Sequence, residues 1–210
     1  MKIGNKVINQ KNEPFIIAEM SGNHNNSIET AFKIVEAAAY AKADAIKLQT
    51  FSPEDMTMNV NDKNFIINDE TSPWNGKKLF DLYELAHTPL EWHKPIMELS
   101  DKLGIICFSS IFNENKIEFL EKLNVPAYKI ASFENNHLPL IESVAKTGKP
   151  IIISTGLASL KEIDETVTVA KKAGCKDLAL LKCTSSYPAK IEDSNLSSIL
   201  KLKSIYDFEI

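Results

Sequence analysis

Short apolar runs that end in polar side chains recur along the chain. They occupy residues 15–21, 45–51, 105–110, 127–132, 151–156 and 178–185. Each run has the length of a buried strand, and segments with the spacing of amphipathic helices separate the runs. Near-continuous apolar strands that alternate with helices are typical of a parallel sheet. The pattern therefore predicts an α/β fold of about six βα units.

Several boundaries carry their own signals. Ser27 is placed to cap a helix, and both Thr88–Glu91 and Ser159–Glu162 have the sequence of a capping box. Residues 207–210 predict the start of a seventh strand after the sixth helix. The residues before Phe15 predict a small hairpin.

The connection over residues 52–87 is far longer than a usual βα loop. Long loops after barrel strands commonly form lids or substrate walls, so we expect this segment to border a site. The alternative is an insertion without a function.

Polar side chains stand where each predicted strand ends, and in parallel α/β folds this edge carries the active site. Lysine in a strand that is buried on both faces is costly unless it meets an anion. Three strand lysines, Lys47, Lys129 and Lys182, lie near serine or threonine hydroxyls. They favour a site for phosphate or carboxylate, although each lysine alone could also extend to solvent from a strand end.

The acidic and histidine side chains leave alternatives open. Glu19 is the only acid at a strand tip, where it could pair with a lysine or move a proton. No two of the four histidines have the spacing of metal ligands, and the chain has no phosphate-binding loop, dinucleotide fingerprint or nucleophile elbow.

Length and charge narrow the class of protein. The 210 residues suffice for one α/β domain, and a net charge of −4 gives no reason to expect nucleic acid or an anionic membrane as partner. No apolar run has the length of a membrane span, no signal peptide is evident, and the three cysteines lack metal or redox spacing. We expect a cytoplasmic protein.

Six segments resemble the sialic acid synthase family, in the same order along the chain: AEMSGNH (18–24), IKLQTF (46–51), DLYELAHTP (81–89), PAYKIASFE (126–134), ISTGLAS (153–159) and LLKCTSSYPA (180–189). The resemblance implies condensation of phosphoenolpyruvate with an amino-sugar aldehyde. Lys182 and the segment with Trp74-Asn75-Gly76 are most similar to pseudaminic acid synthases, which implies 2,4-diacetamido-2,4,6-trideoxy-altrose as the sugar. N-acetylneuraminate or legionaminate synthase is the alternative.

The resemblance also implies roles for individual residues. Glu19, Lys47 and Lys129 would act at the reacting centre. The residues that would hold phosphoenolpyruvate are Lys47, Ser110, Lys129, Ser132, Ser154 and Ser185. Those that would contact the sugar are Gln49, Asn75, Lys182 and Tyr187.

The resemblance implies a (β/α)8 TIM-type barrel, here truncated after about six βα units, with residues 1–210 as an incomplete phosphoenolpyruvate-binding domain. The family's metal ligands, in Gly-Leu-Ser-Asp-His and Glu-X-His-Phe segments, and its C-terminal antifreeze-like domain would lie beyond Ile210. We therefore expect no metal ligand in this chain and no synthase activity from it alone. The complete enzyme would need Mn²⁺ or Mg²⁺ and form a homodimer. An alternative from another functional class is a non-catalytic fragment that only binds phosphoenolpyruvate or oligomerises.

Overall fold

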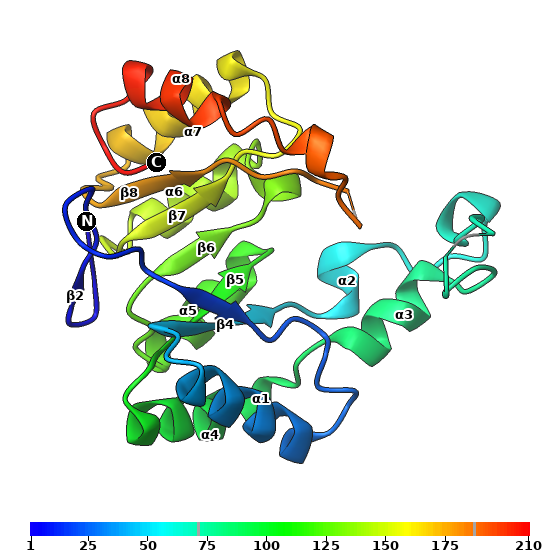
Figure 1. The fold of residues 1–210 in the computed structure, drawn as a ribbon. Helices are drawn as coiled ribbons and strands as arrows, with labels where there is room; N and C mark the ends of the chain where they lie inside the picture. Colours follow the sequence, from blue (N-terminus) through cyan, green and yellow to red (C-terminus); the bar gives the residue numbers. More distant parts are fainter. Residues whose placement is uncertain (71, 187) are drawn as a thin grey trace. The chain divides into compact units, whose positions relative to one another are not determined.

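The computed structural model describes residues 1–70, 72–186 and 188–210 (Figure 1). The chain divides into two compact units. One unit comprises Ile16–Cys107, and the other comprises Met1–Phe15 together with Phe108–Ile210.

The Ile16–Cys107 unit contains two parallel strands and their helices. Its elements are β3 (Ile17–Glu19), α1 (Ile28–Tyr40), β4 (Ala45–Thr50), α2 (Pro53–Met56), a 3-10 turn (Lys63–Phe65), α3 (Leu79–Ala86) and α4 (Leu90–Leu103). Ile46 and Leu48 of β4 enter the apolar core with residues of α1 and α4, which lie side by side. Because side chains alternate along a strand, Lys47 and Gln49 occupy the other face of β4, as predicted.

Two helix starts in this unit were predicted, with different outcomes. The Ser27 hydroxyl accepts a hydrogen bond from the Thr30 backbone N–H at 3.2 Å, which confirms Ser27 as the cap of α1. The predicted capping box at Thr88 is wrong, because α4 begins after Pro89 without a side-chain cap. The buried Thr88 hydroxyl lies instead 3.4 Å from Nε2 of His24, so a tertiary contact has replaced the local one.

The second unit contains the N-terminal hairpin and four βα segments. Its elements are β1 (Lys2–Ile3), β2 (Lys6–Val7), most of β5 (Ile106–Ile111), a 3-10 turn (Glu114–Lys116), α5 (Ile117–Lys122), β6 (Tyr128–Ile130), a 3-10 turn (Ser132–Glu134), α6 (Leu138–Ala145), β7 (Ile151–Ser154), α7 (Leu160–Lys172), β8 (Leu178–Leu181), a 3-10 turn (Ile191–Ser194) and α8 (Ser198–Ile205). Strands β5 to β8 pair in parallel and in chain order. Both units thus have the predicted succession of parallel strands and helices.

Local signals in this second unit are also confirmed. The Ser159 hydroxyl and the Glu162 carboxylate form the predicted capping box at the start of α7. Glu209 forms a parallel bridge with Ala179, and the Leu180 N–H donates to the Glu209 carbonyl at 3.0 Å. This pairing agrees with the predicted start of a seventh strand.

Candidate active site

Lys129 is the buried ammonium group of the second unit. Its side chain comes from the middle of β6, and the residue is only 5% exposed. The ammonium donates to the Ser154 hydroxyl at 2.5 Å and to the Ile130 carbonyl at 2.8 Å. A cation in a closely packed polar setting is suited to hold an anion, because little water screens its charge.

Three further serines lie at the strand ends around this lysine. Ser110 of β5 is buried and stands opposite Lys129 in the β5–β6 register. The Ser132 hydroxyl, just after β6, accepts a hydrogen bond from the Gly156 N–H at 3.2 Å. A Cβ atom added to Gly156 would lie only 2.7 Å from the Ser132 hydroxyl oxygen and 2.1 Å from that of Ser185. The backbone at Gly156 therefore brings two serine hydroxyls together in a space that admits no side chain.

Among the residues predicted to bind phosphoenolpyruvate, Ser110, Lys129, Ser132, Ser154 and Ser185 thus come from successive strand ends of one unit. The connections between them include Cys183, whose thiol lies 3.3 Å from the Ser154 hydroxyl. These groups supply one positive charge and several hydroxyl donors. Such a set fits a phosphate group or a carboxylate.

The Ile16–Cys107 unit carries Glu19 and Lys47, the other two residues predicted to act at the reacting centre. Glu19 and Lys47 are direct partners in the β3–β4 register, and the Lys47 ammonium lies 2.7 Å from a Glu19 carboxylate oxygen. Gln49 lies two residues after Lys47 on the same face of β4 and is half-buried. The pairing supports the interpretation of Glu19 as a charge partner of lysine, and it does not exclude a role in proton transfer.

The residues predicted to contact the sugar belong to both units. Asn75 is exposed in the 52–87 connection, where its side-chain oxygen accepts a hydrogen bond from the Asp69 N–H at 3.0 Å. Lys182 is half-buried after β8, and its ammonium donates to the Thr184 hydroxyl at 3.1 Å. Tyr187 lies outside the described residues. The structure therefore does not bring the Lys182 ammonium to the hydroxyl that binds Lys129.

Glu134 is a site residue that the sequence analysis did not identify. It ends the 3-10 turn that begins at Ser132, and its Oε2 atom is buried without a hydrogen-bond partner among the described residues. Burial raises the pKa of the Glu134 carboxyl, while its own backbone N–H and the positive charge of Lys129 oppose that rise. The sequence signal was its place as the last residue of the PAYKIASFE segment. Only tertiary burial distinguishes Glu134 from an acid on the surface.

Two searches of the described residues bear on other classes of site. No group of three or more His, Cys, Asp or Glu side chains is arranged to hold a metal ion in the described parts of the chain. In the same residues, every helix is too short or too polar to cross a membrane.

The chain is similar to known proteins along its whole length. Pseudaminic acid synthase of Campylobacter jejuni is 45% identical over 210 residues, which are 100% of this chain and 60% of that protein. Pseudaminic acid synthase of Helicobacter pylori is 45% identical over 193 residues, covering 92% of this chain and 56% of that protein. The chain thus spans about 60% of the length of these curated relatives.

A solved structure extends the agreement to the fold. The N-acetylneuraminic acid (sialic acid) synthetase of Leptospira borgpetersenii, in complex with citrate, superposes with a TM-score of 0.86 at 33% identity, covering 99% of this chain and 67% of that one. This match confirms the expected barrel-type α/β fold, of which the chain contains six βα units. The sequence profile of the NeuB family matches residues 34–210. The chain therefore belongs to the NeuB family.

Proposed function

We propose that the protein acts in the synthesis of a nonulosonic (sialic-type) acid, by condensing phosphoenolpyruvate with an amino-sugar aldehyde. The observation that carries the proposal is the buried Lys129 ammonium, which donates to Ser154 at the end of the neighbouring strand. Membership of the NeuB family and the pseudaminic acid synthases among its relatives support this reaction class.

In the proposed reaction, Lys129 and Ser154 bind the phosphate group of phosphoenolpyruvate. The hydroxyls of Ser110, Ser132 and Ser185 supply further donors to the phosphate or the carboxylate. A preorganised ammonium stabilises the negative charge that develops on the departing phosphate. No water has to reorient for this stabilisation. The hydroxyls fix the orientation of the enol phosphate for attack.

The proposed reaction forms one carbon–carbon bond and breaks one carbon–oxygen bond. The C3 carbon of phosphoenolpyruvate attacks the aldehyde carbon of the sugar, and the aldehyde oxygen takes up a proton. Water adds at C2, and the bond between C2 and the phosphate oxygen breaks, so that inorganic phosphate leaves and a 2-keto acid forms. The described residues contain no group of three or more metal-ligating side chains, and for the complete enzyme we propose Mn²⁺ or Mg²⁺, which would polarise the aldehyde.

Residues of the other unit have separate proposed tasks. Lys47 is proposed to bind a carboxylate or phosphate of the substrate, and its contact with Glu19 orients the ammonium. Glu19 would exchange a proton at the reacting centre. Gln49 and Asn75 would contact the sugar, with the 52–87 connection as a wall of the sugar site.

For the sugar we propose the pseudaminic acid precursor, 2,4-diacetamido-2,4,6-trideoxy-altrose. The two pseudaminic acid synthases at 45% identity support this choice over N-acetylmannosamine. Phosphate release from phosphoenolpyruvate by the complete enzyme that contains this chain, measured with each sugar in turn in a manganese-containing buffer, tests both the reaction and the sugar. Mass spectrometry of the product identifies the acid that forms.

The outcomes separate the alternatives. Release that requires the altrose derivative supports the full proposal, whereas preferential use of N-acetylmannosamine would refute the sugar and keep the reaction. Binding of phosphoenolpyruvate without sugar-dependent phosphate release would favour a non-catalytic binding protein.

A further inference from the structure

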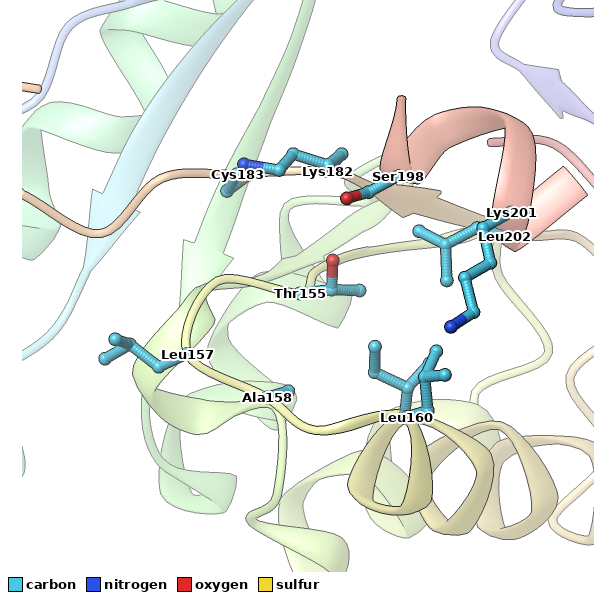
Figure 2. Close-up of a pocket in the computed structure, with 10 residues that line it drawn as sticks. Thr155, Leu157, Ala158, Leu160, Lys182, Cys183, Ser198, Lys201 and Leu202 are labelled. Carbon is cyan, nitrogen blue, oxygen red and sulfur yellow. The ribbon is translucent and has the colours of Figure 1, made fainter. Parts of the chain in front are cut away.

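A cavity of about 410 Å³ opens between the first turns of α7 and α8 (Figure 2). The loops that follow β7 and β8 close its other sides, through residues that include Leu157 and Lys182. All of its lining residues belong to the second unit. Its volume lies in the range of sites for small organic molecules.

The charges around the cavity have one sign. Lys182 and Lys201 are the only charged residues among those that line it, and both are cationic. The Lys182 ammonium donates to Thr184, but neither the Lys201 ammonium nor the Ser198 hydroxyl has a side-chain partner within the described part of the chain. In Figure 2 the Lys201 side chain extends from α8 into the space above Leu160. The first turn of α8 adds the positive end of a helix dipole, whereas the Glu162 carboxylate already caps the first turn of α7, so α8 and the two lysines favour an anion.

The opposite wall of the cavity is aliphatic and incompletely buried. Leu157 is 74% exposed and Leu160 is 42% exposed, although both are large apolar side chains. Leu157 also has a φ of +67°, in the left-handed region that leucine rarely adopts. Local strain of this kind is concentrated at binding sites, and a ligand with an apolar part would remove both leucines from water.

We propose that this cavity binds a small organic anion that carries one carboxylate or phosphate group and a short aliphatic part. The anionic group binds Lys201 and Ser198, and the aliphatic part packs on Leu157 and Leu160. Lys201 and Ser198 are not among the residues proposed to bind phosphoenolpyruvate or the sugar. Lys182 lines the cavity and was also expected to contact the sugar, so Lys201 and Ser198 are the residues that define a second ligand site, and the binding test of these two does not depend on the proposed reaction.

Isothermal titration calorimetry of the purified protein with hexanoate, hexan-1-ol and inorganic phosphate tests the proposal. Hexanoate combines both features, so we expect it to bind at least about tenfold more tightly than either of the other two probes. Lys201→Met removes the charge and keeps the aliphatic stem, and it should weaken hexanoate binding about fivefold. Lys203→Met is the matched control, because Lys203 is exposed on the same helix and does not line the cavity.

Two further measurements separate this cavity from the Lys129 site. Hexanoate should bind the Lys129→Met variant as it binds the unmodified protein, and phosphoenolpyruvate should not displace it. The proposal is overturned if hexan-1-ol binds as tightly as hexanoate, if the two α8 variants bind hexanoate equally, or if phosphoenolpyruvate competes for the site.

Discussion

The Lys47 ammonium lies 2.7 Å from the carboxylate of Glu19, its direct partner in the parallel pairing of β3 and β4. The two side chains differ in exposure, since the lysine is 6% exposed and the glutamate 51%. The Glu19 carboxylate therefore contacts solvent, whereas the Lys47 side chain that it neutralises is almost fully buried. The energetic importance of the pair lies in the cost of leaving the lysine charge buried.

Glu19→Gln should lower the free energy of unfolding by about 1–2 kcal/mol, because it removes the carboxylate and keeps the buried ammonium. Urea unfolding measures the change. Glu118→Gln is the matched control, since it breaks an ion pair of 2.6 Å in which both side chains are more than two-thirds exposed. That control should lower the free energy of unfolding much less, because solvent screens the exposed pair. Equal losses in the two variants would contradict the importance assigned to burial.

Lys129→Met should weaken phosphoenolpyruvate binding at least about tenfold, because a charge-assisted contact to the ligand is lost. The methionine keeps apolar volume, so the free energy of unfolding should not fall by more than about 1 kcal/mol. Calorimetric titration measures the affinity. Lys122→Met, on the exposed surface of α5, should bind phosphoenolpyruvate normally. Unchanged affinity in the Lys129 variant would refute the proposed phosphate site.

Gly156→Ala should reduce phosphoenolpyruvate affinity more than it reduces stability. The new methyl group would lie 2.1 Å from the Ser185 hydroxyl oxygen and 2.7 Å from that of Ser132, so both hydroxyls must rotate away. Serine rotation is inexpensive for the fold but removes two donors from the site. The double variant Gly156→Ala with Ser185→Ala removes the closest clash. Its affinity should stay below that of Ser185→Ala alone, because the methyl group still displaces the Ser132 hydroxyl, and an affinity equal to that of Ser185→Ala alone would contradict this explanation.

Stability should fall between pH 7.5 and pH 4.5 because of His93. Burial lowers the pKa of His93 from 6.5 to about 4, and its ring lies 2.8 Å from the Thr50 hydroxyl. Below the unfolded-state pKa the unfolded chain binds a proton that the folded protein does not, so this group contributes stability that is lost as the pH falls. The loss should approach about 2–3 kcal/mol at pH 4.5.

His93→Gln should flatten this dependence, as measured by urea unfolding at the two pH values. His137→Gln, at an exposed position, should retain it. The same slope in both variants would show that His93 does not cause the loss.

The Glu134 carboxyl should make the free energy of unfolding depend on pH with the opposite sign to His93, and Glu134→Gln should remove this contribution. Because burial raises the pKa of the Glu134 carboxyl, the folded protein binds the proton more tightly than the unfolded chain. This group therefore favours folding at low pH and disfavours it as the pH rises through the folded-state pKa. The thermal stability of the variant, relative to the unmodified protein, should be higher at pH 7.5 than at pH 4.5.

The order of strands and helices could be predicted from the sequence because it follows from local periodicity. Apolar runs with Lys129 or Ser154 near their ends predict strands that carry polar tips, and neighbouring parallel strands must present those tips at one edge. The Ser159–Glu162 capping box was predictable for the same reason, since its partners are three residues apart.

Tertiary structure decided which polar groups meet. Lys129 and Ser154 are 25 residues apart, and only the β6–β7 register brings the ammonium to the hydroxyl. Thr88 has a local capping sequence, yet His24 from a distant segment takes its hydroxyl. Lys182 resembles Lys129 in the sequence, but it lines the cavity beside α8. Local patterns determine the strands and the faces on which their side chains lie. Burial and side-chain contacts depend on segments that are far apart in the chain, and local spacing in the sequence does not specify them.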